Sequence, residues 1–244
     1  VDEPVEEPVE SEEPVEGSYF VAPWGSDSGS GSFEDPFGSL VPVADVVEPG
    51  DVVWLRGGVY DEVGRQVYVR LEMSGAEGAP VTVRSYPGER AVFDGGRHHW
   101  HPRSEGDGRM VSQPILLWVI GDHLVFEDVT FRRGVGDGFY FAGYHNVLRR
   151  VTSHDHHGDG VKFQGSFNVL EYVTSFGNDS VANGGNSADG ISMTDGSIRE
   201  VRSSDSETRG NVIRYALLYE NSDDGIDVWN SWDTLIEYSV SFEN

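Results

Sequence analysis

The residues best suited to chemistry are four aspartates in the last third of the chain. Asp223, Asp224 and Asp227 lie within five residues, and Asp189 holds the position in an earlier repeat that Asp224 holds in this one. Carboxylate oxygens, without His or Cys, favour Ca²⁺ over Zn²⁺, and the flexible coordination of Ca²⁺ accepts ligands from separate parts of a chain. We therefore predict a Ca²⁺ site formed by these four side chains; the alternative is a solvated acidic face.

An Asp-Gly pair begins each of four similar repeats, and this repetition separates structural aspartates from unusual ones. The pairs are Asp137-Gly138, Asp159-Gly160, Asp189-Gly190 and Asp224-Gly225. An Asp in this place commonly caps a turn before a strand, which accounts for Asp137 and Asp159. Asp223 and Asp227 need another explanation, because the other repeats carry Gly, Gly and Ala at the first position and Tyr, Lys and Ser at the second.

The four residues after each Asp-Gly pair alternate between apolar and variable types, which is the period of a strand with one buried face. The side chains predicted to point inward are Phe139, Phe141, Val161, Phe163, Ile191, Met193, Ile226 and Val228. Those predicted to form an outward row are Tyr140, Lys162, Ser192 and Asp227. A second apolar pattern recurs at 146–151, 168–173, 211–216 and 234–239. The first two of these segments are 22 residues apart, and the last two are 23 residues apart.

Self-similarity at this period, with strands and tight turns, predicts an all-β solenoid, and we interpret it as a parallel β-helix. A leucine-rich repeat shares the period, but its Leu/Asn framework is missing. Strands of adjacent coils lie about 4.8 Å apart, so Asp189 is expected beside Asp224. Carboxylates at that distance repel by about 1 kcal/mol in water and more where water is excluded, which favours a bound cation. The longer spacings around this place predict loops at 178–187 and 196–209 beside the site.

Composition limits the partners. The 244 residues contain no Cys and carry a formal charge of −25, and Lys162 is the single lysine. A nucleic acid or an anionic membrane surface needs a basic face, so we expect neither as a partner. Insertion into a membrane is not expected either, because no apolar run reaches 18 residues. An acidic substrate would need a bridging cation.

The two ends of the chain give separate expectations. Residues 1–17 repeat Glu-Pro-Val-Glu and carry eight acids and no base, which predicts a disordered, extended linker before a domain at 18–244. Asp35-Pro36 is typical of a helix start, so we expect a short helix toward Val47 that caps the open end of the solenoid. The segment with His98, His99 and His101 is interpreted as a loop, since adjacent His side chains on a strand point different ways.

Several motifs together resemble family 9 polysaccharide lyases, which are right-handed parallel β-helix pectate lyases. The motifs lie at 19–27, 35–37, 49–51, 56–60, 185–190 (Gly-Asn-Ser-Ala-Asp-Gly) and 221–227 (Asn-Ser-Asp-Asp-Gly-Ile-Asp). The resemblance covers residues 18–244 and implies a secreted enzyme that acts on polygalacturonate. It also implies that Asp189, Asp223, Asp224 and Asp227 bind the catalytic Ca²⁺.

The chemistry that fits is β-elimination, in which Ca²⁺ acidifies the proton next to a uronate carboxylate and a base removes it. The resemblance implies a lysine base in a coil after the double-Asp motif, and the sequence ends at Asn244, so we expect a domain that is incomplete at this end. Lys162 has a similar local context but lies two coils earlier; the alternative is a ladder lysine paired with nearby acids. Trp229 and Trp232 are candidates for stacking on sugar rings, or they only cover their neighbours.

Two other functions stay open. A glycoside hydrolase on the same fold would use Asp223 and Asp224 as its carboxylate pair, although the Gly-His-Gly and Arg-Ile-Lys motifs of β-helix polygalacturonases are absent. A non-catalytic β-helix for adhesion or saccharide binding would need only the coils and the Ca²⁺. In each case we expect a monomer.

Overall fold

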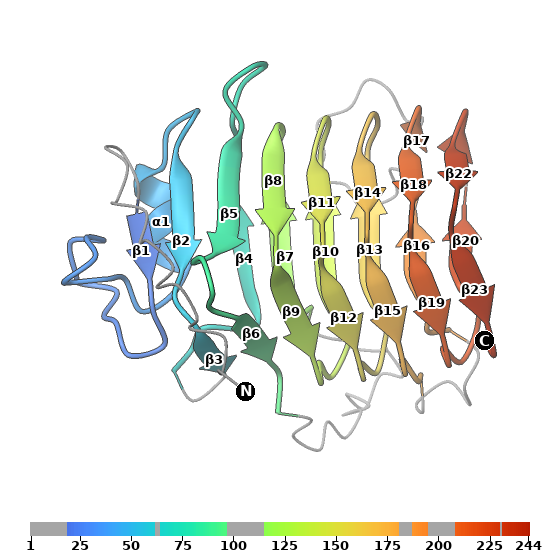
Figure 1. Cartoon of the computed structure of the whole chain (residues 1–244), viewed down its shortest axis with the longest axis horizontal. Coiled ribbons are helices and arrows are strands. Elements are labelled where there is room, and N and C mark those ends of the chain that lie inside the picture. The colour runs from blue at the N-terminus through green and yellow to red at the C-terminus, as the bar shows by residue number, and fades with distance from the viewer. Residues whose placement is uncertain (1–18, 62–63, 97–114, 181–186, 195–207, 230) are drawn as a thin grey trace, which may run out of the picture.

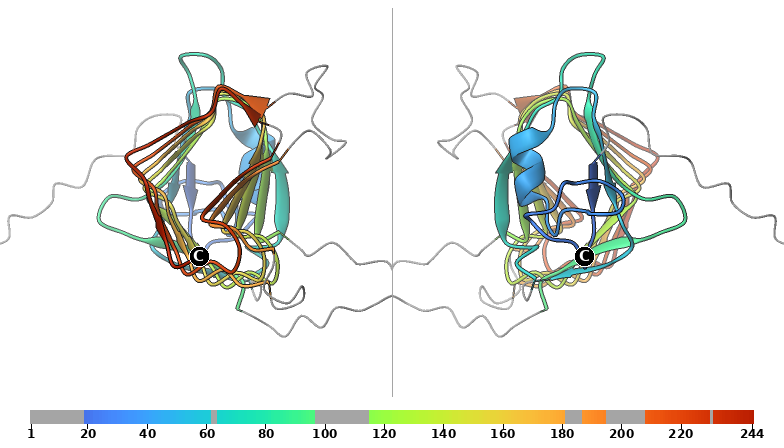
Figure 2. Two further views of the ribbon diagram at one scale, coloured as in Figure 1. Left: turned by 90° about the vertical axis from the view of Figure 1, so that its right-hand side faces the viewer. Right: turned by 90° about the vertical axis from the view of Figure 1, so that its left-hand side faces the viewer.

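The computed structural model describes residues 19–61, 64–96, 115–180, 187–194, 208–229 and 231–244. Within them the chain winds through three parallel sheets that run side by side along one axis, with the N-terminal coils at one end and residue 244 at the other (Figure 1). Seen along this axis, the coils superimpose as a three-sided tube (Figure 2). The expectation of a parallel β-helix is confirmed.

Each sheet takes one short strand from each successive coil. The eight-stranded sheet contains β1 (Tyr19–Val21), β2 (Val52–Leu55), β5 (Val81–Ser85), β8 (Leu124–Glu127), β11 (Val147–Arg149), β14 (Val169–Glu171), β18 (Val212–Arg214) and β22 (Leu235–Glu237). The seven-stranded sheet contains β3 (Gly58–Asp61), β6 (Ala91–Asp94), β9 (Val129–Arg132), β12 (Thr152–His154), β15 (Thr174–Phe176), β19 (Leu217–Tyr219) and β23 (Val240–Phe242).

The third sheet carries the strands that follow the Asp-Gly pairs. It contains β4 (Val69–Glu72), β7 (Leu117–Ile120), β10 (Phe139–Ala142), β13 (Val161–Gln164), β16 (Ile191–Met193) and β20 (Ile226–Val228). A small pair, β17 (Thr208–Arg209) and β21 (Ser231–Trp232), completes the strands of the described residues. The residues of the predicted outward row share one face, since Tyr140 pairs with Lys162, Lys162 with Ser192, and Ser192 with Asp227. Lys162 and Asp227 are half-buried, whereas Tyr140 and Ser192 are buried.

The interior is filled by the predicted inward side chains. Phe139, Val161 and Ile191 are fully buried, and the rings of Phe131, Phe139, Phe141 and Phe163 stack or tilt against one another along the axis. Val228 lies in register with the buried Met193, on the predicted face, but it is 40% exposed because β20 lies at the edge of its sheet. Stacking rings from successive coils removes their faces from water, and this apolar burial stabilises the fold.

Buried asparagines tie the coils together at the turns. The side-chain carbonyl of Asn168 accepts the backbone N–H of Asn146 at 2.9 Å, and that of Asn211 accepts the N–H of Asn168 at 2.8 Å. A second ladder joins Asn178 and Asn221, whose side chains bond at 2.8 Å. Because each amide bonds the next coil, the turns leave few buried backbone groups without a partner.

The capping helix forms, but it starts later than predicted. α1 spans Val41–Val46 and lies at the N-terminal end of the tube, next to β4 (Figure 2), and the side chain of its Val43 is buried. Asp35 does not begin the helix, because its side chain accepts the N–H of Ser30 at 2.8 Å in the preceding loop. Pro42 lies in the first turn, where a missing backbone donor has no cost.

Other expectations lie outside the described residues: the linker at 1–17, the segment with His98, His99 and His101, and most of the two loops at 178–187 and 196–209. Among the helices of the described residues, none is long and apolar enough to cross a membrane.

Candidate metal centre

The repeated aspartates form a ladder along one corner of the tube. Oδ1 of Asp137 accepts the backbone N–H of Asp159, Oδ1 of Asp159 accepts that of Asp189, and Oδ1 of Asp189 accepts that of Asp224, each at 3.0 Å. The ladder explains why Asp recurs before each of these strands. It uses one oxygen of each carboxylate, so the second can bind another partner. The structural role expected for Asp137 and Asp159 therefore extends to Asp189.

The glycine that follows each Asp is required by close packing. A Cβ at Gly160 would lie 2.0 Å from Oγ of Ser175, and one at Gly225 would lie 2.0 Å from Oγ of Ser241. No side chain fits at these distances, so the corner can turn tightly only with Gly. In each pair, the Asp carboxylate accepts a hydrogen bond from the adjacent coil. The Gly, which has no side chain, allows the backbone to pass close to the neighbouring strand.

At the last two rungs, extra acids turn the ladder into a cluster. Asp189, Asp223 and Asp224 each present a carboxylate oxygen within 4.8 Å of those of the other two. Asp189 is buried, whereas Asp223 and Asp224 are exposed, so the cluster opens to solvent on one side. Three of the four predicted ligands are therefore brought together. Asp227 is outside this group of three, on β20 opposite Ser192 of the neighbouring strand.

The electrostatics of the cluster show unbalanced negative charge. Burial, followed by the charge of Asp159 and then those of Asp227 and Asp223, raises the pKa of Asp189 to about 7. Burial and the neighbouring carboxylates, Asp224 first among them, also raise the pKa of Asp227. Asp227 is thus electrostatically coupled to the cluster although it is not in the group of three. A cation would offset the repulsion that, together with burial, raises both pKa values.

The donor set fits a hard divalent cation. All the converging atoms are carboxylate oxygens, the type that Ca²⁺ and Mg²⁺ bind, and they come from two coils at the spacing of the sheet. The exposed side leaves room for further oxygen ligands from water or from a substrate. The described residues therefore include a group that can hold a metal ion.

Lys162 is an ammonium held by two aspartates. Its Nζ donates to Oδ2 of Asp159 at 2.7 Å and lies 3.8 Å from Oδ2 of Asp137. Burial disfavours the charged form, but the charges of Asp137 and Asp159 outweigh it and raise the pKa of Lys162. This confirms the pairing of a ladder lysine with nearby acids, and a protonated amine cannot accept a proton, which weighs against Lys162 as the base.

The two candidate sugar-stacking residues are both on the surface. Trp229 is 61% exposed and follows β20, and Trp232 is 63% exposed in β21, opposite Arg209. Their exposure agrees with either role considered for them, so contact with a sugar stays a prediction.

One contribution to the site was not predicted. Asp159 was assigned only to a turn, yet it bonds Lys162 and is the charged neighbour that most raises the pKa of Asp189. The sequence does contain a sign of this pairing, because the single lysine follows the Asp of one repeat by three residues. The contact could not be predicted without knowing that the row with Lys162 and the ladder with Asp159 lie on the same surface.

The comparisons with known proteins agree with this architecture. Residues 19–244 match the family described as Pel9A-like, right handed beta helix region. The chain is 29% identical to pectate lyase PEL9 of Emericella nidulans, over 86% of this chain and 49% of that protein. It is also 29% identical to pectate lyase L of Dickeya chrysanthemi, over 93% of this chain and 50% of that protein.

Among solved structures, the crystal structure of pectate lyase Pel9A superimposes with a TM-score of 0.73 at 27% identity, over 91% of this chain and 52% of that one. The chain therefore spans about half the length of the relatives it matches. Because the family match extends over nearly all of the described coils, this chain belongs to the family of Pel9A-like right-handed β-helix proteins.

Proposed function

We propose that the protein carrying this chain is a secreted, Ca²⁺-dependent polysaccharide lyase that cleaves polygalacturonate by β-elimination. The observation that carries the proposal is the convergence of Asp189, Asp223 and Asp224 within 4.8 Å on a coil stack similar to that of pectate lyases. Since the chain spans about half of its relatives, the activity is proposed for the protein that contains it. A polymeric substrate also supports a location outside the cell.

The proposed ligands are the three clustered aspartates with Asp227 beside them. Asp189 would bind from the buried side, with the oxygen that the ladder leaves available, while Asp223 and Asp224 would bind from the solvent side. A bound Ca²⁺ would bridge this cluster to a uronate carboxylate and make the adjacent proton easier to remove. The same bridge explains how a chain with a formal charge of −25 can bind an acidic polymer.

Lys162 is proposed to organise the site rather than to take the proton. It neutralises Asp159, which would otherwise add a further negative charge beside Asp189. A non-catalytic module that binds Ca²⁺ and saccharide is the second candidate function, because the acidic cluster can hold a cation whether or not a base acts beside it.

The products distinguish the candidates. The protein is incubated with polygalacturonate, with Ca²⁺ or with EDTA, and the ultraviolet absorbance of unsaturated ends and the number of reducing ends are followed. A lyase gives unsaturated ends only with Ca²⁺, and Asp224→Asn should lower that rate at least 100-fold, since it removes a cluster carboxylate. Reducing ends without absorbance would instead show a hydrolase, and neither product, with retained binding, would show a binding module.

A further inference from the structure

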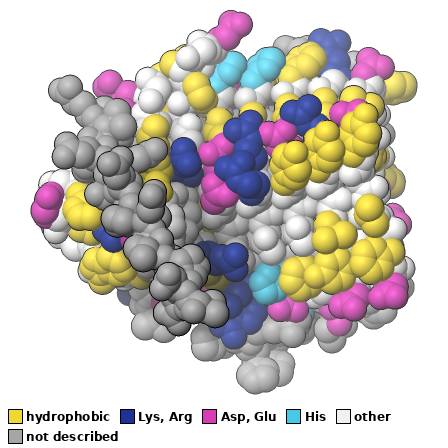
Figure 3. Space-filling view, in the orientation of Figure 1, with side chains coloured by type: hydrophobic (Ala, Val, Ile, Leu, Met, Phe, Trp, Pro, Cys, Tyr) yellow, Lys and Arg dark blue, Asp and Glu magenta, His cyan; other side chains and the backbone are white. Residues whose placement is uncertain are grey.

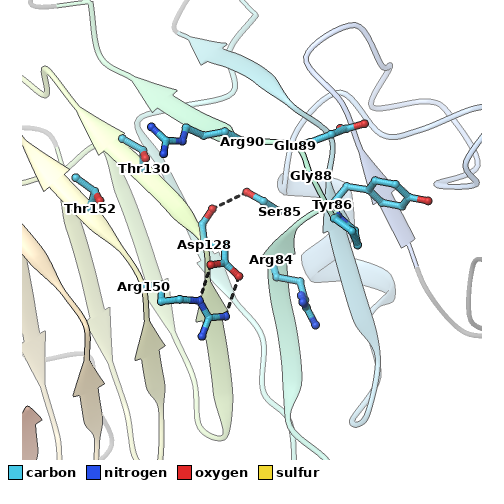
Figure 4. Close-up of a pocket in the computed structure, with 11 residues that line it drawn as sticks. Arg84, Ser85, Tyr86, Gly88, Glu89, Arg90, Asp128, Thr130, Arg150 and Thr152 are labelled. Carbon is cyan, nitrogen blue, oxygen red and sulfur yellow. Dashed lines mark hydrogen bonds and ion pairs between the residues drawn. The ribbon is translucent and has the colours of Figure 1, made fainter. Parts of the chain in front are cut away.

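A second candidate site lies at the corner between the eight- and seven-stranded sheets. There a cavity of about 400 Å³ opens between the turn that follows β5 and the corners of the next two coils. None of the clustered aspartates lines it. Its lining is Arg84, Ser85, Tyr86, Pro87, Gly88, Glu89, Arg90, Asp128, Thr130, Arg150 and Thr152, most of which are labelled in Figure 4.

The acids that line the cavity already have partners. Asp128 receives two hydrogen bonds from the guanidinium of Arg150, at 2.6 and 2.8 Å. Glu89 is bonded by Arg56 at 2.7 Å and extends away from the centre of the cavity (Figure 4). Neither carboxylate is left to neutralise the remaining two arginines of the lining.

Those two arginines have unused hydrogen-bonding capacity. The side chain of Arg90 is exposed, extends toward Thr130 (Figure 4), and makes no ion pair or hydrogen bond within the described part of the chain, although its backbone carbonyl accepts the N–H of Gly58 at 3.0 Å. Arg84 extends the other way (Figure 4), with its guanidinium 4.9 Å from the centroid of the Trp54 ring and its Nε, which has no hydrogen-bond partner, 3.7 Å from Oε2 of Glu127. The unpaired guanidinium of Arg90 therefore favours an anionic ligand.

Hydroxyl groups stand beside these charges. Thr130 and Thr152 are directly opposite each other on β9 and β12, so their side chains are about 4.8 Å apart along the surface. Basic and acidic side chains alternate along the same face of the molecule (Figure 3). Guanidinium groups bind a carboxylate through paired hydrogen bonds, and threonine hydroxyls can bond sugar hydroxyls. The volume is within the range of small-ligand pockets.

We infer that this cavity binds a uronate residue of an acidic polysaccharide through the guanidinium of Arg90 and the hydroxyl groups of Thr130 and Thr152, without a metal ion. The inference rests on the proposed function for the identity of the polymer. Because the chain has a formal charge of −25, it can bind a ligand carboxylate only where basic side chains are locally in excess or where a metal ion bridges the two. The cavity would therefore give the polymer a second, metal-independent contact, on a different corner from the acidic cluster.

The test is calorimetric titration of the 244-residue chain with tetragalacturonate in excess EDTA, where the acidic cluster has no cation. We expect saturable binding, and Arg90→Ala should weaken it at least tenfold through loss of a charge-assisted hydrogen bond. Arg65→Ala is the matched control, because Arg65 is also exposed, loses the same charge and does not line the cavity. It should change the affinity less than twofold, and a neutral galactose tetramer should not bind.

Equal losses in the two variants would show a general charge effect and overturn the inference, as would an absence of binding in EDTA or equal binding of the neutral tetramer. Arg90 has no partner to lose, so its variant should keep the melting temperature of the parent chain. Thr130→Val provides an independent probe of the same cavity and should also weaken binding. Asp223→Asn should leave the binding in EDTA unchanged.

Binding in EDTA without any elimination by the protein would refute the proposed function alone. Elimination without such binding would refute this inference alone.

Discussion

Replacing Asp223 with Asn tests the metal centre with little change of shape. Asp223 is exposed and is one of the acids that raise the pKa of Asp189. The substitution removes one negative charge from the cluster but keeps the side-chain size. In the absence of metal the variant should be at least as stable as the parent chain, because it loses only repulsion.

The loss in affinity follows from the size of the cluster. A unit negative charge and a divalent cation at 4.8 Å, the limit of the cluster, attract by about 3 kcal/mol for an effective dielectric constant of about 40, which lies between bulk water and a typical surface pair. This corresponds to a dissociation constant about 100-fold higher. At a Ca²⁺ concentration 100 times the parent's dissociation constant, binding stabilises the parent by about 2.7 kcal/mol and the variant by about 0.4 kcal/mol.

Thermal unfolding followed by circular dichroism measures this difference. For a domain of this length each kcal/mol corresponds to about 2 to 4 °C, so the parent should gain about 5 to 11 °C in Ca²⁺ and the variant less than about 2 °C. Asp137→Asn is the control, since its Oδ1 can still accept the N–H of Asp159 and it is not in the cluster. Equal Ca²⁺ responses in the two variants, or no response in the parent chain, would refute the assignment.

Two further predictions concern the scaffold. Gly160→Ala should destabilise the chain by about 1 to 3 kcal/mol in urea unfolding, because its Cβ would lie 2.0 Å from Oγ of Ser175, and adding Ser175→Ala should recover part of the loss. For Asp94, burial favours the neutral acid, but hydrogen bonds from Arg133 and Arg132 outweigh it and lower the pKa below its usual 3.8. The stabilisation of the folded chain by ionised Asp94 is therefore present above about pH 4 and is lost as the pH falls through the lowered pKa. Asp94→Asn should lower the free energy of unfolding by about 3 kcal/mol at pH 7 and reduce its dependence on pH below pH 4. An unchanged dependence on pH in the variant would contradict this account.

The sequence by itself determined the coil stack. Alternation of apolar and variable residues after each Asp-Gly pair is a local pattern, and its repetition makes neighbouring strands pair in register, as Tyr140, Lys162 and Ser192 do. It also identified the acidic cluster, because Asp223 breaks a repeat in which other coils carry a small residue. Such features can be predicted from the sequence because, in a solenoid, residues that are one repeat apart in the chain are neighbours in space.

The third strand of each coil was harder to predict. Strands such as β12 and β15 are three residues long and contain Thr and Ser, so the alternation that marks a half-buried strand is too brief to detect. The start of α1 was also misplaced, since Asp35 fits a loop cap as well as a helix cap. Competition between local hydrogen bonds of similar strength decides such boundaries.

Only the tertiary structure decided the electrostatics. The protonated state of Lys162 depends on its distances to Asp159 and Asp137, and the raised pKa of Asp189 depends on burial as well as on charges from other coils. The arginine-lined cavity likewise combines residues from three coils that no sequence period relates. Charge interactions depend on the distance through space and on exclusion of water, and both arise only when the coils are stacked.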